Sequence, residues 1–322
     1  MSDGLISTPV AAVAAVAAAT LIAVAGVRVK KSTRSDLVPL TAVLGAFVFA
    51  AQMVNFSIPG TGSSGHIIGG ILLAAFLGPW AAFLALSSVL IIQCLIFADG
   101  GLLALGCNIV NMAAMSCLVA YPLVFRPLMR RGASVARILT ASVLSCTVAL
   151  ELGACLVVVE TKLSGVTALS TGTFLLLMTA IHLAIGIGEG LATGAVLAFV
   201  RRTRPALLAQ SEGDGRSSKG AIIAFALAAA AIAGGLSFAA SSDPDGLEWS
   251  VEKVAGTSEL PSSGIAAATA QKLQASTAAM PDYENTLSGI IGAALAMLTL
   301  WGLCSLLTHR RLSLSKVRRT NE

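Results

Sequence analysis

Long apolar runs with almost no charge recur along this chain, and they constrain its fold more than any other feature. A helix needs about 20 apolar residues to cross the hydrocarbon core of a bilayer, which is about 30 Å thick. Runs of this kind lie near residues 8–27, 37–56, 80–98, 101–125, 138–159, 172–200, 219–240 and 286–308. Charged residues make up only 11% of the sequence, against about 25% in soluble domains. We therefore predict an all-α integral membrane protein.

A further apolar stretch, "HIIGGILLAAFLGPW", reaches Gly78 and Pro79 after only about a dozen residues. It suits a short helix buried in protein better than one that faces lipid. Lys and Arg concentrate on the cytoplasmic side of membrane proteins, and they decide whether this helix crosses. The chain has four basic clusters, within residues 28–34, 126–137, 201–219 and 310–319. They all lie on the same side of the membrane only if this short helix crosses it. This arrangement predicts nine crossings, with the N-terminus outside and the C-terminus in the cytoplasm of a multi-pass cell-membrane protein.

A polar stretch beginning "TRPALLAQSEGDG" at residue 203 predicts a linker over residues 203–218. It would separate a membrane domain of seven crossings, residues 1–202, from a two-helix hairpin, residues 219–322. The hairpin would enclose an external loop, residues 241–285, that is rich in Asp and Glu. Such a loop either attracts cations or is simply a solvated connector.

Several functional classes lack their sequence signatures here. The chain has no GxxxxGK[ST] loop for nucleotide phosphates, and no HExxH or GxSxG motif. The net charge of +5 lies in short clusters between apolar runs instead of on one polar face, so we expect no nucleic-acid partner. We therefore expect the protein not to be an enzyme and not to hydrolyse ATP alone.

Three ionisable residues could carry chemistry. His66, in "GTGSSGH", lies at the predicted outer mouth, where an imidazole can bind a borderline divalent metal or instead cap a helix. His182 and Glu189 share one helix face, about 10 Å apart along the axis. Ionisable groups within a span usually face the bundle interior. We interpret this pair as polar groups that link helices; the alternative is the acid and base of an intramembrane enzyme.

Four segments together resemble one known family. They are "SDGLIS", "FVFAAQMVNFSIPGTGSSGHIIGGILLAAFLGPWAAF", "FADGGLLALGCNIVNM" and "HLAIGIGEGLATG". They resemble the CbiM/NikM family, the substrate-capture subunits of cobalt and nickel energy-coupling factor (ECF) transporters, from residue 2 to about residue 200. The later "SSDPDGLEWSVEKV" resembles the small two-helix companion subunit of these transporters, here fused to the first.

The resemblance implies a seven-helix capture unit whose N-terminus folds back into the protein from outside. In this family the metal is held by the N-terminal amine, by the imidazole and backbone nitrogen of a second-position histidine, and by a loop histidine. His66 matches the loop histidine, and the amine would be that of Met1. Planar nitrogen ligation suits Ni²⁺ or Co²⁺ and disfavours tetrahedral Zn²⁺.

The beginning of the chain departs from the family pattern. It reads Met1, Ser2, Asp3, Gly4, without the family's second-position histidine. We expect that the start was placed at an internal methionine and that the natural chain carries Met-His ahead of Met1. With the start as written, a membrane scaffold that binds no metal is a further alternative.

The resemblance also implies a function and its partners. The chain would be the substrate-binding permease subunit of an ECF transporter, with Ni²⁺ or Co²⁺ as transported substrate and no permanent cofactor. It would lie in membrane lipid and work with a transmembrane coupling subunit and paired ATP-binding subunits. On family resemblance, the fusion of the capture subunit to its companion slightly favours nickel over cobalt as the substrate.

Overall fold

The computed structural model describes residues 1–32, 38–130, 132, 134–208, 219–235, 240–258, 260–262, 264–281 and 286–319. Six segments in these ranges are helical and apolar enough to cross a membrane, which confirms the prediction of an all-α integral membrane protein. Five of them are α1 (Thr8–Ser32), α4 (Pro79–Phe97), α7 (Val135–Ser164), α8 (Thr171–Thr203) and α13 (Thr286–Arg319). The sixth joins α5 (Leu105–Asn108), the π-helical η3 (Ile109–Phe125) and α6 (Arg126–Met129).

Three further apolar helices in the described ranges are shorter than the about 20 residues that a lipid-facing span needs. They are α2 (Val38–Gln52), α3 (Gly70–Leu77) and α10 (Lys219–Gly234). Almost every residue of α2 and α3 is buried, because other helices surround them. A helix covered by protein does not need to match the thickness of the bilayer. The short buried helix predicted from "HIIGGILLAAFLGPW" is therefore present as α3, and it begins four residues after His66.

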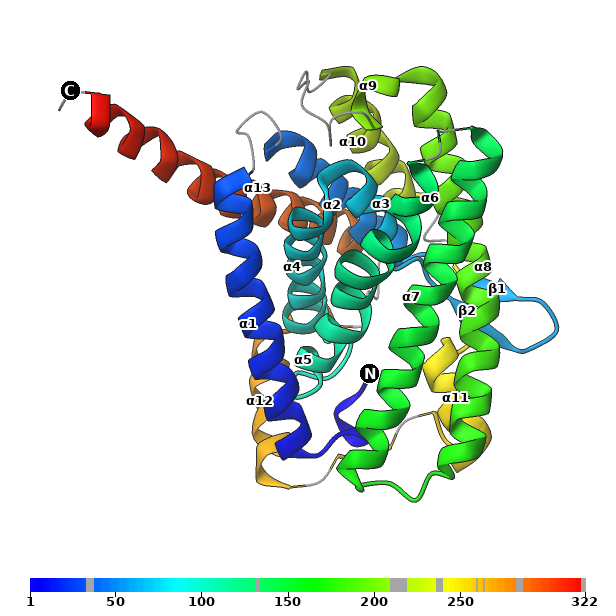
Figure 1. Cartoon of the computed structure of the whole chain (residues 1–322). Helices are drawn as coiled ribbons and strands as arrows, with labels where there is room; N and C mark the ends of the chain where they lie inside the picture. The colour runs from blue at the N-terminus through cyan, green and yellow to red at the C-terminus, as the bar shows by residue number, and fades with distance from the viewer. Residues whose placement is uncertain are drawn as a thin grey trace.

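The two ends of the molecule carry different parts of the chain (Figure 1). The N-terminus, with the 3₁₀ turn η1 (Asp3–Leu5), lies in the same half as α11 (Gly246–Ala255) and α12 (Ile265–Thr277). The short α9 (Pro205–Leu208) and the C-terminal end of α13 lie in the opposite half. The predicted loop 241–285 thus contains two helices, while residues 209–218 of the predicted linker lie outside the described residues.

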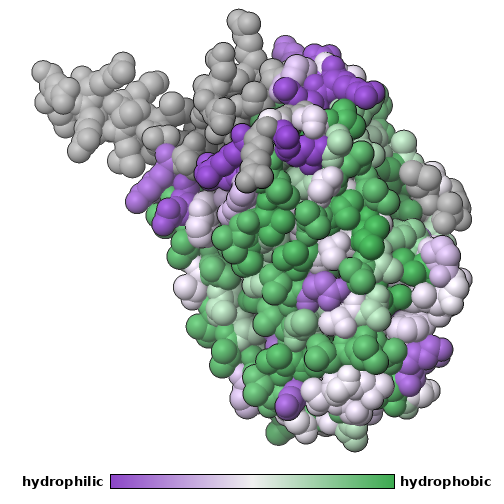
Figure 2. All heavy atoms as spheres, turned by 45° about the vertical axis from the view of Figure 1, so that its right-hand side comes forward, coloured by the Kyte–Doolittle hydropathy of each residue, from purple (hydrophilic) through white to green (hydrophobic). Residues whose placement is uncertain are grey.

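The surface follows the same division. Figure 2 shows a broad hydrophobic area over the middle of the molecule, with hydrophilic residues gathered mainly toward its two ends. Exposed apolar side chains lie on the long helices, such as Leu163 on α7, Leu176 and Phe199 on α8, and Leu298 on α13. Such continuous apolar exposure is far larger than soluble proteins carry, so this face fits contact with lipid.

Helices α7 and α8 pack closely because α8 presents glycines to α7. A Cβ added at Gly186 would lie 2.7 Å from the Cα of Thr147, and one at Gly194 would lie 2.8 Å from Leu139 Cδ2. Small residues let helices approach closely in membranes, where apolar burial alone does not drive them together. This contact fixes α8, which carries both His182 and Glu189.

Glu189 joins α8 to the turn that precedes α3. Its Oε1 accepts a hydrogen bond from the backbone N–H of Gly69 at 2.9 Å, and the side chain is buried. Gly69 has φ 77°, a left-handed conformation that favours glycine. His182, in contrast, pairs through Nδ1 with the carbonyl oxygen of Met178, one turn back on its own helix, at 2.7 Å. The interpretation as helix-linking groups therefore holds for Glu189 and is wrong for His182.

The Glu189 contact generates a prediction about the turn before α3. Glu189→Ala leaves the Gly69 N–H buried without its acceptor, which costs about 1–3 kcal/mol. We expect faster amide exchange over residues 62–70 in the purified protein, measured by hydrogen–deuterium exchange and mass spectrometry. Glu189→Gln keeps a carbonyl acceptor and serves as the matched control, so exchange there should stay near wild type. Equal exchange in all three proteins would contradict this role.

Candidate functional site

The segment that carries His66 is a small β-hairpin. Strand β1 (Phe56–Ile58) pairs antiparallel with β2 (Ser63–Gly65), in the register that sets Phe56 opposite Gly65. Gly60 and Gly62 have φ of 78° and 70°, which the tight turn requires. Within the turn, the Thr61 hydroxyl donates to the carbonyl oxygen of Ile58 at 2.8 Å. The hairpin delivers His66 directly after β2.

The C-terminal part of the chain docks on this hairpin. Ser64 donates from its backbone N–H to the carbonyl oxygen of Pro244 and from its hydroxyl to that of Asp243, both at 2.8 Å. The indole N–H of Trp249 donates to the carbonyl oxygen of Thr61 at 3.0 Å. Residues 243–245 therefore run alongside β2 as a partial third strand, with one parallel bridge between Ser64 and Asp245.

Helix α11 begins at this contact. Asp245 Oδ1 accepts from the backbone N–H of Glu248 at 2.8 Å, and Glu248 Oε2 accepts from the backbone N–H of Asp245 at 3.2 Å. These two bonds form a capping box, which fixes the first turn of a helix. Gly246 then packs against α8, where an added Cβ would lie 3.3 Å from Cε1 of His182.

The N-terminus folds back into the protein, as the family resemblance implies. The carbonyl oxygen of Met1 accepts from the backbone N–H of Gly101 at 3.1 Å, and Oδ1 of Asp3 accepts from that of Ala104 at 3.0 Å. Burial raises the pKa of the Asp3 carboxyl above its usual range, although the bond from Ala104 opposes the shift. Leu5 is buried in an apolar cluster that includes Phe174 of α8.

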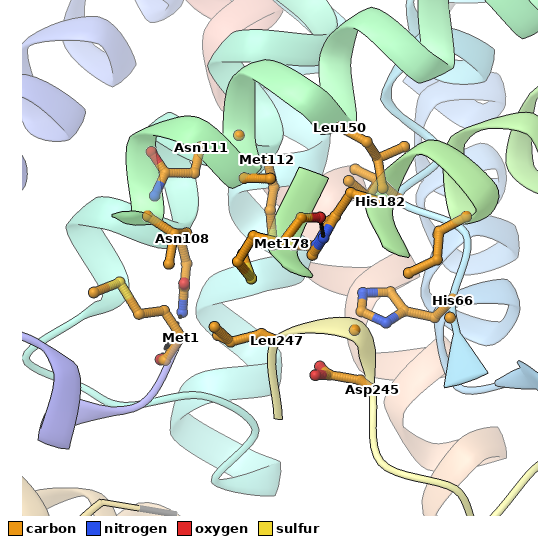
Figure 3. Close-up of a pocket in the computed structure, with 17 residues that line it drawn as sticks. Met1, His66, Asn108, Asn111, Met112, Leu150, Met178, His182, Asp245 and Leu247 are labelled. Atoms are coloured by element: carbon orange, nitrogen blue, oxygen red, sulfur yellow. Dashed lines mark hydrogen bonds between the residues drawn. The ribbon is translucent and has the colours of Figure 1, made fainter. Parts of the chain in front are cut away.

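These elements enclose an inner cavity of about 110 Å³. Figure 3 shows His66 and His182 on one side of it, Asp245 below them, and Met1 with Asn108 on the opposite side. The structure thus brings both residues predicted from the family pattern, His66 and Met1, to one cavity. The remaining walls are largely apolar, formed in part by Met112, Leu150, Val157, Met178, Ile185 and Leu247.

A larger outer cavity of about 540 Å³ adjoins the inner one. Its polar lining includes the carboxylates of Asp3, Asp99 and Glu248 and the amides of Gln52 and Gln93. Six residues line both cavities, namely Met1, His66, Asn108, Met112, Asp245 and Leu247. His66 and Asp245 therefore lie at the boundary between the two cavities.

The alternative role of His66 as a helix cap is wrong. The cap of α3 is Gly69, and the His66 ring forms no hydrogen bond within the described part of the chain. His182 also lines the inner cavity, whereas Glu189 bonds to the backbone at Gly69. Within the described ranges, no three His, Cys, Asp or Glu side chains lie close enough to hold one metal ion. Any ion in this cavity would need main-chain, terminal or water ligands as well.

Sequence reasoning alone singled out His182 without placing it beside His66, and it did not single out Asp245. His182 belongs to a helix far along the chain, and no local motif connects it to His66. Asp245 has a signal that was available: "DGLE" places Asp and Glu three residues apart, the pattern of a capping box. That pattern predicts a helix start inside the stretch expected to be a loop.

Comparison with known proteins gives two family matches. Residues 1–207 match the family described as the cobalt uptake substrate-specific transmembrane region, and residues 219–309 match the PDGLE domain. A protein of Rhodobacter capsulatus named fused nickel transport protein NikMN is 33% identical over 224 residues, covering 64% of this chain and 63% of that protein. A cobalt transport protein CbiM of Geobacter sulfurreducens is 29% identical over 278 residues, covering 79% and 77%.

Solved structures give the same assignment. A crystal structure described as a truncated transition metal transporter aligns with a TM-score of 0.56 at 31% identity, covering 63% of this chain and 98% of that one. The names of these similar proteins point to transport and not to enzymatic catalysis. The chain therefore belongs to the cobalt uptake substrate-specific transmembrane family, with a PDGLE domain following in the same polypeptide.

Proposed function

We propose that this protein is the substrate-binding permease subunit of an energy-coupling factor transporter that imports Ni²⁺ or Co²⁺. The observation that carries the proposal is that His66 and Met1 line one inner cavity, which adjoins a larger polar cavity. An imidazole and a terminal amine are nitrogen donors of the type that both metals accept. The metal is cargo, and the proposal includes no permanent cofactor.

The domain division belongs to the same proposal. Residues 1–202 would form the capture domain, residues 203–218 a linker, and residues 219–322 the companion domain with its external loop 241–285. A transmembrane coupling subunit and paired ATP-binding subunits would supply the energy, since the sequence carries no phosphate-binding loop. The fused relative of Rhodobacter capsulatus is named for nickel, so Ni²⁺ is the first metal to test.

An enzymatic function fits the geometry less well. An acid–base pair must reach a common substrate, but Glu189 bonds to the Gly69 backbone and His182 bonds to its own helix. The relatives described above are named as transport proteins. Transport therefore accounts for the cavity better than catalysis by His182 and Glu189.

The first prediction of this proposal concerns His66. His66→Ala removes a ligand, and we expect Ni²⁺ affinity to fall by about a hundredfold or more, since each 1.4 kcal/mol is about a tenfold change. Isothermal titration calorimetry of the purified full chain, in versions with and without an added N-terminal Met-His, measures the change. His309→Ala, near the C-terminal end of α13, is the matched histidine control. Equal affinity of His66→Ala and wild type in both versions would refute the proposed site.

The second prediction concerns the N-terminus. Residues added ahead of Met1 would begin inside the cavity, on the side opposite His66 (Figure 3). A Met-His extension adds an imidazole and a chelate ring, so we expect it to raise Ni²⁺ affinity at least about tenfold. Amine, imidazole and amide nitrogens bind metal only when deprotonated, and the extended chain should therefore gain affinity more steeply as pH rises. Titrations of both chains with Ni²⁺ from about pH 6 to about pH 8.5 test this. A chain with a Met-Ala extension is the control. If affinity rises equally with pH in the unextended chain and the Met-His chain, the model is contradicted.

The third prediction concerns orientation. We propose that the N-terminus and residues 241–285 lie outside the cell and the C-terminus inside, because the basic clusters would then share the cytoplasmic side. The placement of α11 and α12 in the same half as the N-terminus supports this (Figure 1). In intact cells, a membrane-impermeant maleimide should label Ala255→Cys, an exposed position in α11, but not Thr203→Cys, an exposed position in α8. The wild-type chain is the background control, since its cysteines are buried or half-buried. The opposite labelling would overturn the topology.

A further inference from the structure

The geometry points to Asp245 as the carboxylate that balances the charge of the captured cation, so that the C-terminal part of the chain completes the capture site. This inference rests on the proposed function, because it concerns the same cavity. It adds a residue that lies far from His66 in the sequence. It also adds a kind of ligand chemistry that the nitrogen donors do not provide.

The first observation is the position of Asp245. It lines both the inner and the outer cavity, as His66 does. Figure 3 shows its carboxylate beneath His66, directed toward the inner cavity. A cation held beside His66 at this boundary would therefore share the cavity with this carboxylate.

The second observation is charge. Among the described residues that line the inner cavity, Asp245 is the one acidic side chain. The other polar side chains there, His66, His182, Asn108 and Asn111, carry no negative charge. Imidazoles and a terminal amine bind metals as neutral donors. A divalent ion held by them keeps its full charge, and an uncompensated charge in a largely apolar cavity is costly.

The third observation is that suitable atoms remain available. Asp245 Oδ1 accepts the capping bond from Glu248, while Oδ2 forms no hydrogen bond within the described ranges. His182 uses Nδ1 toward Met178, which leaves Nε2 without a hydrogen bond to any described residue. His66 forms none through its ring in the described part. Three side chains thus present unpaired polar atoms to one small cavity.

The fourth observation is that Asp245 is held in place. Its backbone N–H donates to Glu248 Oε2 at 3.2 Å, and the carbonyl oxygen of neighbouring Pro244 accepts from Ser64 N–H at 2.8 Å. A carboxylate fixed before the ion arrives needs little reorganisation to interact with it. The capping box therefore serves the site as well as the helix.

The test must separate the charge of Asp245 from its role as a helix cap. Asn and Ser cap helices about as well as Asp, and Glu is not among the preferred capping residues. Asp245→Asn and Asp245→Ser therefore keep the cap and remove the charge, while Asp245→Glu keeps the charge and weakens the cap. Glu252→Gln, an exposed position in α11, is the control for loss of one negative charge outside the cavity.

Calorimetric titration of the full-length variants with Ni²⁺ gives the answer. We expect Asp245→Asn and Asp245→Ser to bind about tenfold more weakly or worse, and Asp245→Glu and Glu252→Gln to stay within about threefold of wild type. The reverse order, with Asp245→Glu weakest, would overturn the inference and leave a capping role alone. Wild-type affinity in Asp245→Asn with loss of binding in His66→Ala would also overturn it while the proposed function stands. Equal binding by wild type and His66→Ala would refute the proposed function, and this inference with it.

Discussion

The backbone hydrogen bond from Ser64 to Pro244 is the contact on which the arrangement of the site depends. A hairpin placed beside lipid-facing helices exposes backbone groups that need partners. Strand β2 finds one partner in β1 and the other in residues 243–245, far along the chain. The bond holds His66 next to the first turn of α11. As a result the two parts of the polypeptide share one cavity.

Apolar burial and hydrogen bonding contribute differently to the contact between α11 and the first part of the chain. Leu5, Phe174 and Val251 come from the N-terminus, α8 and α11 and are buried in one apolar cluster. Each such side chain contributes about 1.5–3 kcal/mol when fully buried, whereas a hydrogen bond contributes about 0.5–1.5 kcal/mol net. The apolar cluster and the hydrogen bonds therefore both stabilise the docked position of α11. The bonds at Ser64 and Trp249 set the register.

The apolar runs were sufficient to predict the class of fold, because a lipid environment leaves few other structures for them. The short helix α3 was also predictable, since Pro79 ends its apolar run early. The partners of His66 were not predictable from local patterns. The contacts of Glu189 with Gly69 and of Ser64 with Pro244 join residues 120 or more positions apart, and such contacts depend on how helices pack. The family resemblance supplied the fold-back of Met1, which no local pattern indicates.

The position of Asp245 at the start of α11 also explains why an acidic residue can lie at this cavity without destabilising the first part of the chain. A carboxylate within a membrane helix is expensive, but Asp245 caps α11 instead and lies beside strand β2 with its capping bond in place. The backbone N–H of Glu248 donates a hydrogen bond to the Asp245 carboxylate, which lowers the free-energy cost of burying that charge. The positive end of the α11 dipole stabilises it further. Negative charge can therefore be placed at the cavity without adding an acid to any helix that faces lipid.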